Sequence, residues 1–377
     1  MKKYWYVLSV LFLVLWACSS DNTDETPMTD DDISMSDDDG GMQNVFDRST
    51  LLVNWADNII IPSYKSFQTT MAQLVIDYES FEQEPILQNL QTLRTSWLNA
   101  YKSWQSISMF EIGPAEAIGL RLNVNTYPTD VMLVEMNIAN GGYNFDLSSN
   151  RDAKGFPALD YLLNGFATDD LGILEKFTTD AQKDANLLYL KDVINNIKSL
   201  TDSVIAEWEG DYRAIFVNND GSSATASVDR FSNDFVFYYE KFLRAGKMGI
   251  PLGVFSGIQS PNTIESFYSP ENSNELFLEG LDAVQNFFNG ASLGESMASY
   301  LTTLDRKDLA DDINAQFDAA RTAVEALDSF RTELETNNPS IAMLSAYDEV
   351  QKAVSLLKVD MFSAMSISID FVDADGD

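Results

Sequence analysis

The spacing of the apolar residues is the feature that most constrains how this chain of 377 residues folds. Apolar side chains recur every three or four positions almost throughout, which is the period of one helix face, and strand-type alternation is nearly absent. The pattern is clearest at residues 90–104, 193–208, 231–242, 313–334 and 344–361. Wide apolar stripes opposite charged faces favour antiparallel bundles. We therefore predict an all-α protein whose striped aromatic residues form the core.

Short local signals mark where some helices begin. Ser292 and Glu295 have the spacing of a capping box before a helix at 297–304, and Ser340 is placed to cap the last long helix. Pro62 should kink a long first helix, because proline has no backbone N–H to donate.

The helical segments fall into two halves. Several segments precede residue 175 and several follow it, which predicts two tandem domains that resemble four-helix bundles, at 44–175 and 176–377. Irregular stretches interrupt the helices, and in a helical protein function tends to collect in long loops. These stretches are 112–130, 140–155 and 246–274.

The N-terminus has the pattern of an export signal. Lys2 and Lys3 precede an apolar run that is too short to span a bilayer comfortably, so residues 1–17 read as a signal peptide. The run ends in "LWAC", similar to the lipobox of bacterial lipoproteins, which predicts lipid attachment at Cys18. The alternative is an ordinary signal cleaved nearby that leaves a free thiol. Cys18 is the only cysteine, so no intramolecular disulfide can form.

Residues 18–43 are polar, acidic and free of basic residues, which predicts a disordered tether. An acidic stretch behind a lipidated cysteine resembles the surface-export signals of lipoproteins from Bacteroidetes-type bacteria. A solvated spacer that faces the periplasm is the alternative. Both interpretations predict an outer-membrane lipoprotein, on the cell surface or on the periplasmic face, whose membrane contact is the N-terminal lipid.

Charge and composition exclude several classes of function. The chain has 58 acidic and 24 basic residues; without the nine acids at 21–39 and the two lysines of the signal, 49 acids face 22 bases, a net charge near −27. Such a surface repels a phosphate backbone, so we expect no nucleic-acid partner. The chain has no histidine, which excludes Ser-His-Asp catalysis and metal sites that rely on histidine.

Several motifs together resemble one known family. They are "SWLNAYKSWQSISMFEIGPAEA" at 96–117, "NTYPTD" at 125–130, "KGFPALDYLLNG" at 154–165, "YYEKFLRAGKMGIPLG" at 238–253, "SPNTIESFYSPENS" at 260–273 and the C-terminal "DFVDADGD". In this order they are similar to the imelysin family, also called the iron-regulated protein A family. The resemblance implies two helical bundles with a site where they meet, and a lipid-anchored or periplasmic protein tied to iron or other metal acquisition. Some members are classed as metallopeptidases and others as binding components of uptake systems.

The family motif GxHxxE is degenerate in this chain. It reads Gly155, Pro157 and Asp160 at the positions of glycine, histidine and glutamate. Residues three apart share a helix face, so the original pair could hold one cation, but proline has no ligating atom. Peptidase activity is therefore not expected, since a catalytic metal needs about three protein ligands. As plain structure, Pro157 would be the first residue of a helix, and Asp160 would lie in its first turn, near the positive end of the helix dipole.

The remaining acidic candidates lie in the other motif-like loops. Glu111 precedes a Gly-Pro turn and Glu265 opens "ESFYS". If these loops converge on Asp160, the three carboxylates could hold an oxygen-ligated ion such as iron or calcium. Ser266 could line the same ligand pocket, or Ser266 and Ser269 could cap the next helix.

Three functions follow as hypotheses. The leading one is a non-catalytic, lipid-anchored protein that binds a ligand or metal, or a partner in an uptake system, in iron or metal acquisition. The second is a metal-dependent peptidase or other hydrolase with a carboxylate-only site. The third is a cell-surface interaction protein without pocket chemistry.

Overall fold

In the computed structural model the described residues are 46–371, and they form helices with no β-strand among them. The prediction of an all-α protein is confirmed. The predicted signal peptide (1–17), Cys18 and the predicted tether (18–43) lie outside the described residues. Within the described part, no helix is both long enough and apolar enough to cross a membrane.

The α-helices have the following bounds: α1 Arg48–Asn54, α2 Ile61–Gln83, α3 Leu87–Gln105, α4 Pro114–Ile118, α5 Leu120–Val124, α6 Val131–Asn140, α7 Gly155–Asp160, α8 Asp170–Thr178, α9 Lys183–Glu207, α10 Arg213–Asn218, α11 Ser227–Phe237, α12 Ile250–Leu252, α13 Ser273–Phe288, α14 Met297–Thr303, α15 Lys307–Glu325, α16 Phe330–Thr336, α17 Ile341–Ser355 and α18 Phe362–Met365. Four short 3₁₀ turns lie at Ser148–Ala153, Pro261–Thr263, Pro270–Asn272 and Gly290–Ser292.

Several helices contain π-helical segments, in which one extra residue widens the turn. They are Trp55–Ile60, Tyr161–Gly165, Trp208–Tyr212, Tyr238–Gly249 and Leu356–Met361. The first of them runs directly into α2, whose second residue is Pro62. A π-helical segment thus stands where a proline kink was predicted.

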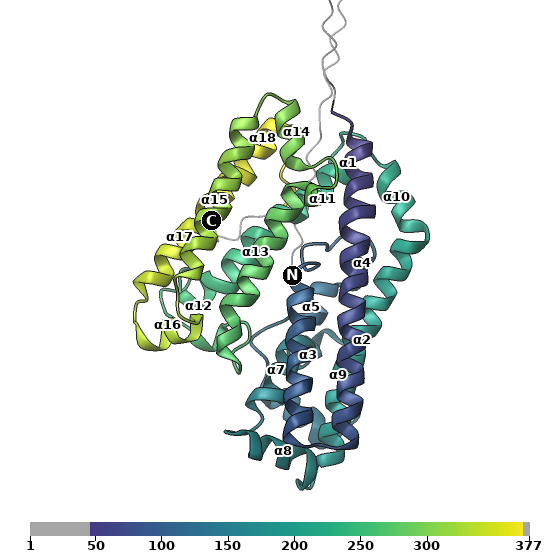
Figure 1. Ribbon diagram of the computed structural model, residues 1–377, viewed down its shortest axis with the longest axis vertical. Coiled ribbons are helices and arrows are strands. Elements are labelled where there is room, and N and C mark those ends of the chain that lie inside the picture. The colour runs from purple at the N-terminus through teal and green to yellow at the C-terminus, as the bar shows by residue number, and fades with distance from the viewer. Residues whose placement is uncertain (1–45, 372–377) are drawn as a thin grey trace, which may run out of the picture. The chain divides into compact units, whose positions relative to one another are not determined.

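The long helices form two groups (Figure 1). In one group α2 lies between α3 and α9, and in the other α15 packs against α13 and α17. Contacts between α3 and α13 join the two groups. Helix α9 follows the predicted boundary at residue 175, yet it packs against α2 and α7, which precede that boundary. The division into domains 44–175 and 176–377 stays a prediction.

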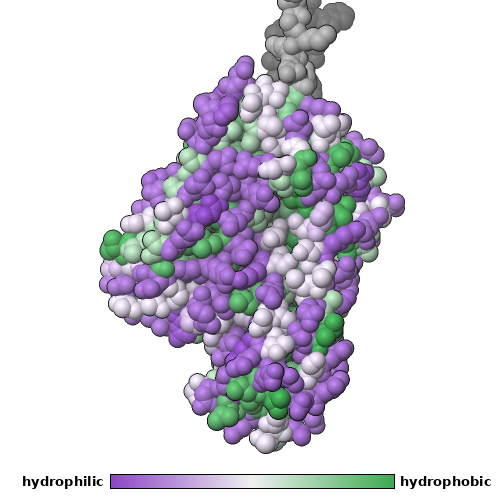
Figure 2. Space-filling model, in the orientation of Figure 1, coloured by the Kyte–Doolittle hydropathy of each residue, from purple (hydrophilic) through white to green (hydrophobic). Residues whose placement is uncertain are grey.

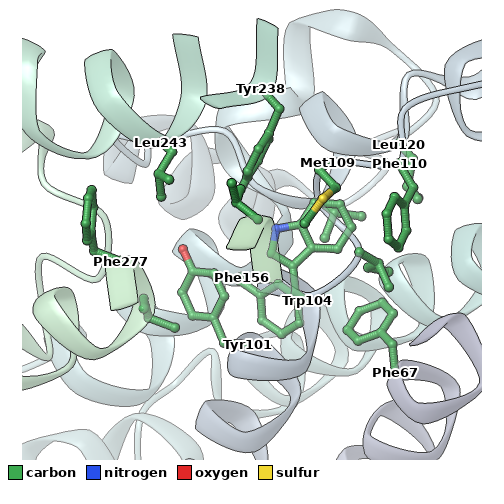
Figure 3. Packing of buried hydrophobic residues seen from close by; sticks show 14 of the residues in the cluster. Phe67, Tyr101, Trp104, Met109, Phe110, Leu120, Phe156, Tyr238, Leu243 and Phe277 are labelled. Carbon is green, nitrogen blue, oxygen red and sulfur yellow. The ribbon is translucent and has the colours of Figure 1, made fainter. Parts of the chain in front are cut away.

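The aromatic stripes pack inside the protein. Trp97, Tyr101 and Trp104 of α3 are each at most 1% exposed. Tyr101 stacks on Phe156 of α7 with ring centres 4.6 Å apart, and Trp104 lies 5.8 Å from Phe67 of α2 (Figure 3). One stripe therefore ties α2, α3 and α7 together. The face of the molecule in Figure 2 is mostly hydrophilic, with apolar residues in separate patches.

The two predicted helix caps had different outcomes. Ser340 caps α17, with the backbone N–H of Met343 donating to its hydroxyl over 3.2 Å. The capping box predicted at Ser292 and Glu295 is wrong, because the box before α14 is formed by Ser296 and Ser299. Ser292 lies instead in a 3₁₀ turn with a φ of +57°.

Candidate functional site

The degenerate motif forms helix α7 and the π-helical turn that follows it. The helix begins at Gly155, whose φ is +77° and whose missing Cβ would lie 2.2 Å from the carbonyl oxygen of Val124. Only glycine fits this start, since a side chain would be both strained and in collision. Pro157 is therefore the third helical residue, where its missing N–H is still not needed for an intrahelical bond.

Because the helix begins at Gly155 and not at Pro157, the prediction that Asp160 lies in its first turn is wrong. Asp160 is the last residue of α7, far from the positive end of its dipole. Its carboxylate is 1% exposed and accepts three hydrogen bonds, from the backbone N–H of Tyr268 (2.8 Å), the hydroxyl of Ser269 (2.6 Å) and the amide of Asn164 (3.1 Å). Asp160 thus fastens the "ESFYS" loop to α7.

Burial raises the pKa of Asp160 to about 6, and the three donors oppose that rise. The carboxyl is therefore mostly ionised at neutral pH and becomes protonated in mildly acidic solution. The lining of the surrounding pocket contains no lysine or arginine that would neutralise its charge.

Asp160 lines a pocket of about 170 Å³. Pro157, Thr129 and Ser266 also line it. The two positions where this chain departs from the family motif, Pro157 and Asp160, therefore both face the pocket. The hydroxyl of Thr129 is buried and has no hydrogen-bond partner. Buried polar atoms are seldom left unpaired, so this oxygen has a hydrogen-bonding capacity that the protein does not use. The full lining is Tyr127, Pro128, Thr129, Pro157, Asp160, Asn262, Ile264, Ser266, Phe267 and Tyr268.

Ser266 lines the pocket and Ser269 ties the loop to Asp160, but neither side chain caps the next helix. The Ser266 hydroxyl lies 2.7 Å from that of Ser269, which donates to Asp160. Ser266 has a φ of +61°, a strained value for a residue with a side chain. Arg331 of α16 holds the loop from the other side, through a hydrogen bond of 3.0 Å to the Phe267 carbonyl and a contact with its ring.

Glu265 lies beside this pocket but points into a buried polar cluster. It is 2% exposed and forms an ion pair with Lys247 of the π-helical segment Tyr238–Gly249. Its other oxygen accepts from the amides of Asn125 (2.7 Å) and Gln105 (3.3 Å). Both oxygens therefore have protein partners.

Glu111 belongs to a different site. Its carboxylate accepts from the backbone N–H of Arg121, and its own N–H donates to Asp234, which also contacts the Arg121 guanidinium. Burial raises the pKa of Glu111 to about 7 and that of Asp234 to about 6, although Arg121 opposes both shifts. Glu111 and Asp234 line a second pocket of about 260 Å³ together with Glu116 and Asp370.

The predicted three-carboxylate ion site is therefore not assembled. Among residues 46–371, no three acidic side chains stand close enough together to hold a metal ion. Asp160 already accepts three donors, Glu265 is paired with an ammonium and Glu111 lines another pocket. These partners do not fit an iron or calcium ion, which requires several free oxygen ligands at once.

Several residues that complete the site were not singled out from the sequence. Asn125 and Lys247 hold Glu265, Asn164 donates to Asp160, and Thr129 lines the pocket. Each of these residues lies inside one of the quoted motifs, so the motif as a whole was the only sequence signal that marked it as part of a site. Nothing in the spacing of these residues identified which side chains point inward.

The chain was compared with known proteins. The imelysin family model, which carries a peptidase label, matches residues 60–357. Iron-regulated protein A of Synechococcus elongatus is 24% identical over 305 residues, which cover 78% of this chain and 80% of that protein.

Two crystal structures have a similar fold, each with a TM-score of 0.67. One is described as an iron-regulated protein A precursor from Parabacteroides distasonis; it is 18% identical, and the match covers 84% of this chain and 95% of that one. The other is an imelysin-like protein from Psychrobacter arcticum, 16% identical, with 86% and 97% covered. These structures share the fold, and since the family model spans most of the sequence, the chain belongs to the imelysin family.

Proposed function

We propose that this protein is a non-catalytic binding protein of the cell envelope, held to the outer membrane by a lipid on Cys18, with the pocket beside Asp160 as its ligand site. The observation that supports binding is the pairing of an ionised, buried carboxylate with an unpartnered buried hydroxyl, that of Thr129, in one pocket wall. Both groups accept hydrogen bonds, and the lining has no cation.

The chemistry of the lining favours a small ligand that donates hydrogen bonds. A carboxylate and a hydroxyl oxygen recognise an ammonium or hydroxyl group. A carboxylate ligand would face Asp160 without a lysine or arginine to hold it. The class of ligand is therefore a small amine or polyol.

The proposed link to iron acquisition rests on the relatives, which are named iron-regulated protein A. Because no three acidic side chains among residues 46–371 stand close enough to hold a metal ion, we propose that the link runs through an organic ligand and a partner of an uptake system, not through a bare ion.

Hydrolysis through a metal has no support from the side chains. Pro157 has no ligating atom, and the Asp160 oxygens hold Tyr268 and Ser269. A chelator-sensitive peptidase activity that is lost in Asp160→Ala or Glu265→Ala would establish the enzyme hypothesis and overturn this proposal.

The test is a titration of the mature chain from Cys18 onward, made without the lipid. We expect ethanolamine, which carries an ammonium and a hydroxyl, to bind more tightly than acetate, and Asp160→Asn to weaken ethanolamine binding. Ferric, ferrous, calcium and zinc ions should show no tight binding that depends on Asp160. Equal binding of ethanolamine and acetate, or tight metal binding lost in Asp160→Asn, would contradict the proposed ligand class.

Attachment to the membrane has its own test. Cells fed a labelled fatty acid should incorporate the label into this protein, and Cys18→Ser should abolish the labelling. Label that persists in the variant would refute attachment at Cys18.

A further inference from the structure

A third, larger pocket shares the Tyr127–Pro128 segment with the Asp160 pocket. It measures about 510 Å³, within the range of roughly 300–1,000 Å³ that is usual for sites of small organic ligands. Its walls come from the end of α5, the loop after it, the π-helical segment Tyr238–Gly249 and the turn after α12.

The mouth of this pocket is lined by large apolar side chains that are partly open to solvent. Leu122 is 42% exposed, Ile250 48% and Phe255 43%, and Phe242 lines the same pocket. Single exposed apolar residues are ordinary on a protein surface, but here they converge on one concavity. Covering them with an apolar ligand would remove their surface from water.

The charge of this pocket is opposite to that of the protein. None of its lining residues is acidic, although the chain carries 58 acids, and its single charged lining residue is Lys241. The Lys241 ammonium lies 5.4 Å from the ring centre of Phe237 and forms no ion pair with any of residues 46–371. By contrast, the two pockets described above contain carboxylates.

Three other polar side chains of the lining already have partners, and a fourth, Tyr127, contributes a phenol hydroxyl. Asn125 accepts from Tyr101 and donates to Glu265. The hydroxyls of Thr126 and Thr263 donate to backbone carbonyls, each over 2.7 Å. Polar recognition in this pocket therefore falls to Lys241 and to the hydroxyl of Tyr127, and Lys241 supplies the only charge in the lining.

The backbone that presents Lys241 and Phe242 is the π-helical segment, and such segments occur frequently at functional sites. The same segment carries Lys247, whose pair with Glu265 fixes it from the inside. One irregular segment thus anchors the buried cluster and places Lys241 in the lining of an apolar pocket.

We propose that this pocket binds a small organic anion with an apolar body, a monocarboxylate whose carboxylate lies at Lys241 and whose chain contacts Phe242, Ile250 and Phe255. Physiological salt screens charges that are more than about 8 Å apart, so acidic residues farther than that from Lys241 repel a bound anion only weakly. The site is separate from the Asp160 pocket, and the proposal stands whether or not that pocket binds an amine.

The test compares three eight-carbon probes that differ in their head group: octanoate, 1-octanol and octylammonium. Each is titrated into the mature chain, made without the lipid, and binding is followed by ligand-observed NMR and calorimetry. We expect octanoate to bind most tightly and octylammonium least.

Two sets of variants locate the site. Lys241→Gln should weaken octanoate binding about fivefold, as expected for one partly exposed ion pair, and should leave octanol unchanged. Lys183→Gln is the matched control, because Lys183 is also an exposed lysine but lies outside the pocket, and it should change nothing. Phe255→Glu and Leu122→Glu, both at exposed positions, should each abolish octanoate binding.

The proposal is overturned if octanoate does not bind at millimolar concentration. It is also overturned if octanoate and octanol bind equally and Lys241→Gln has no effect, or if octylammonium binds most tightly. Octanoate binding that survives both glutamate variants in chains that retain wild-type circular dichroism would place the anion elsewhere and equally refute it.

Discussion

The buried ion pair of Lys247 and Glu265 gives the sharpest test of how the site is held. The two side chains are 4% and 2% exposed, and the pair joins the π-helical segment to the start of the "ESFYS" loop. Burial lowers the pKa of Lys247, and Glu265 only opposes this effect. The pair therefore costs desolvation energy even while its members attract each other.

We expect Lys247→Met to lower the free energy of unfolding by about 3–5 kcal/mol, because it leaves the Glu265 carboxylate buried without a cation. Asn125 and Gln105 would still donate to that carboxylate, so the lower end of this range applies. The double variant Lys247→Met with Glu265→Gln removes both charges and should recover most of the loss. The coupling between the two sites should then be about 2 kcal/mol or more.

Urea unfolding of the wild type, both single variants and the double variant measures this coupling as a double-mutant cycle. Lys307→Met is the control, since Lys307 and Asp311 are more than 60% exposed and such a pair contributes at most about 1 kcal/mol. If Lys247→Met unfolds within experimental error of the wild type, or if the double variant loses as much as the sum of the single variants, the pair does not hold the loop.

Three further predictions concern α7, its neighbouring loop and pH. Gly155→Ala should destabilise the fold by about 3 kcal/mol, seen as a lower melting temperature, because its Cβ meets the Val124 carbonyl at a positive φ. Gly165→Ala should displace Tyr268, whose ring would lie 2.1 Å from the new Cβ; faster hydrogen exchange of the Tyr268 amide would show this, and unchanged exchange would contradict it. Burial raises the pKa of Asp160 to about 6, that of Asp234 to about 6 and that of Glu111 to about 7. Between pH 8 and pH 5 the native state therefore binds protons that the unfolded chain does not bind, and the free energy of unfolding should rise by at least about 1 kcal/mol as the pH falls from 8 to 5. Urea midpoints measure this rise, and Asp234→Asn should reduce it.

The fold was predictable because helix periodicity is a local property of the sequence. The stripe of Leu90, Leu93, Trp97, Tyr101 and Trp104 is buried along its whole length. The misplaced capping box shows the limit of such signals, since Ser292 and Ser296 both precede apolar residues and only the backbone decides which one caps. The π-helical segments carry no pattern that the helical period reveals, because a single inserted residue shifts the register without changing composition.

The site was predictable only as a set of segments. Asp160 and Tyr268 are separated by 108 positions, and their hydrogen bond depends on where two loops are carried by the helix packing. A glutamate in a motif-like loop looks the same whether it faces a ligand pocket or a lysine. For this reason the sequence made Glu265 and Glu111 equally good candidates for the carboxylate site. In the structure Glu265 pairs with Lys247, whereas Glu111 lies with Arg121 and Asp234.

Pro157 and Asp160 both line the same pocket, so the helix face that the family motif uses is retained although its histidine is not. A histidine at position 157 would be three residues from the carboxylate on this face, in the arrangement that suits a shared cation. In this chain the carboxylate is instead committed to Tyr268 and Ser269, and it stabilises the loop that forms the pocket. The position therefore still shapes the pocket, and in the function that we propose, the ligand is recognised by the hydroxyl of Thr129 and by the remaining acceptor capacity of Asp160.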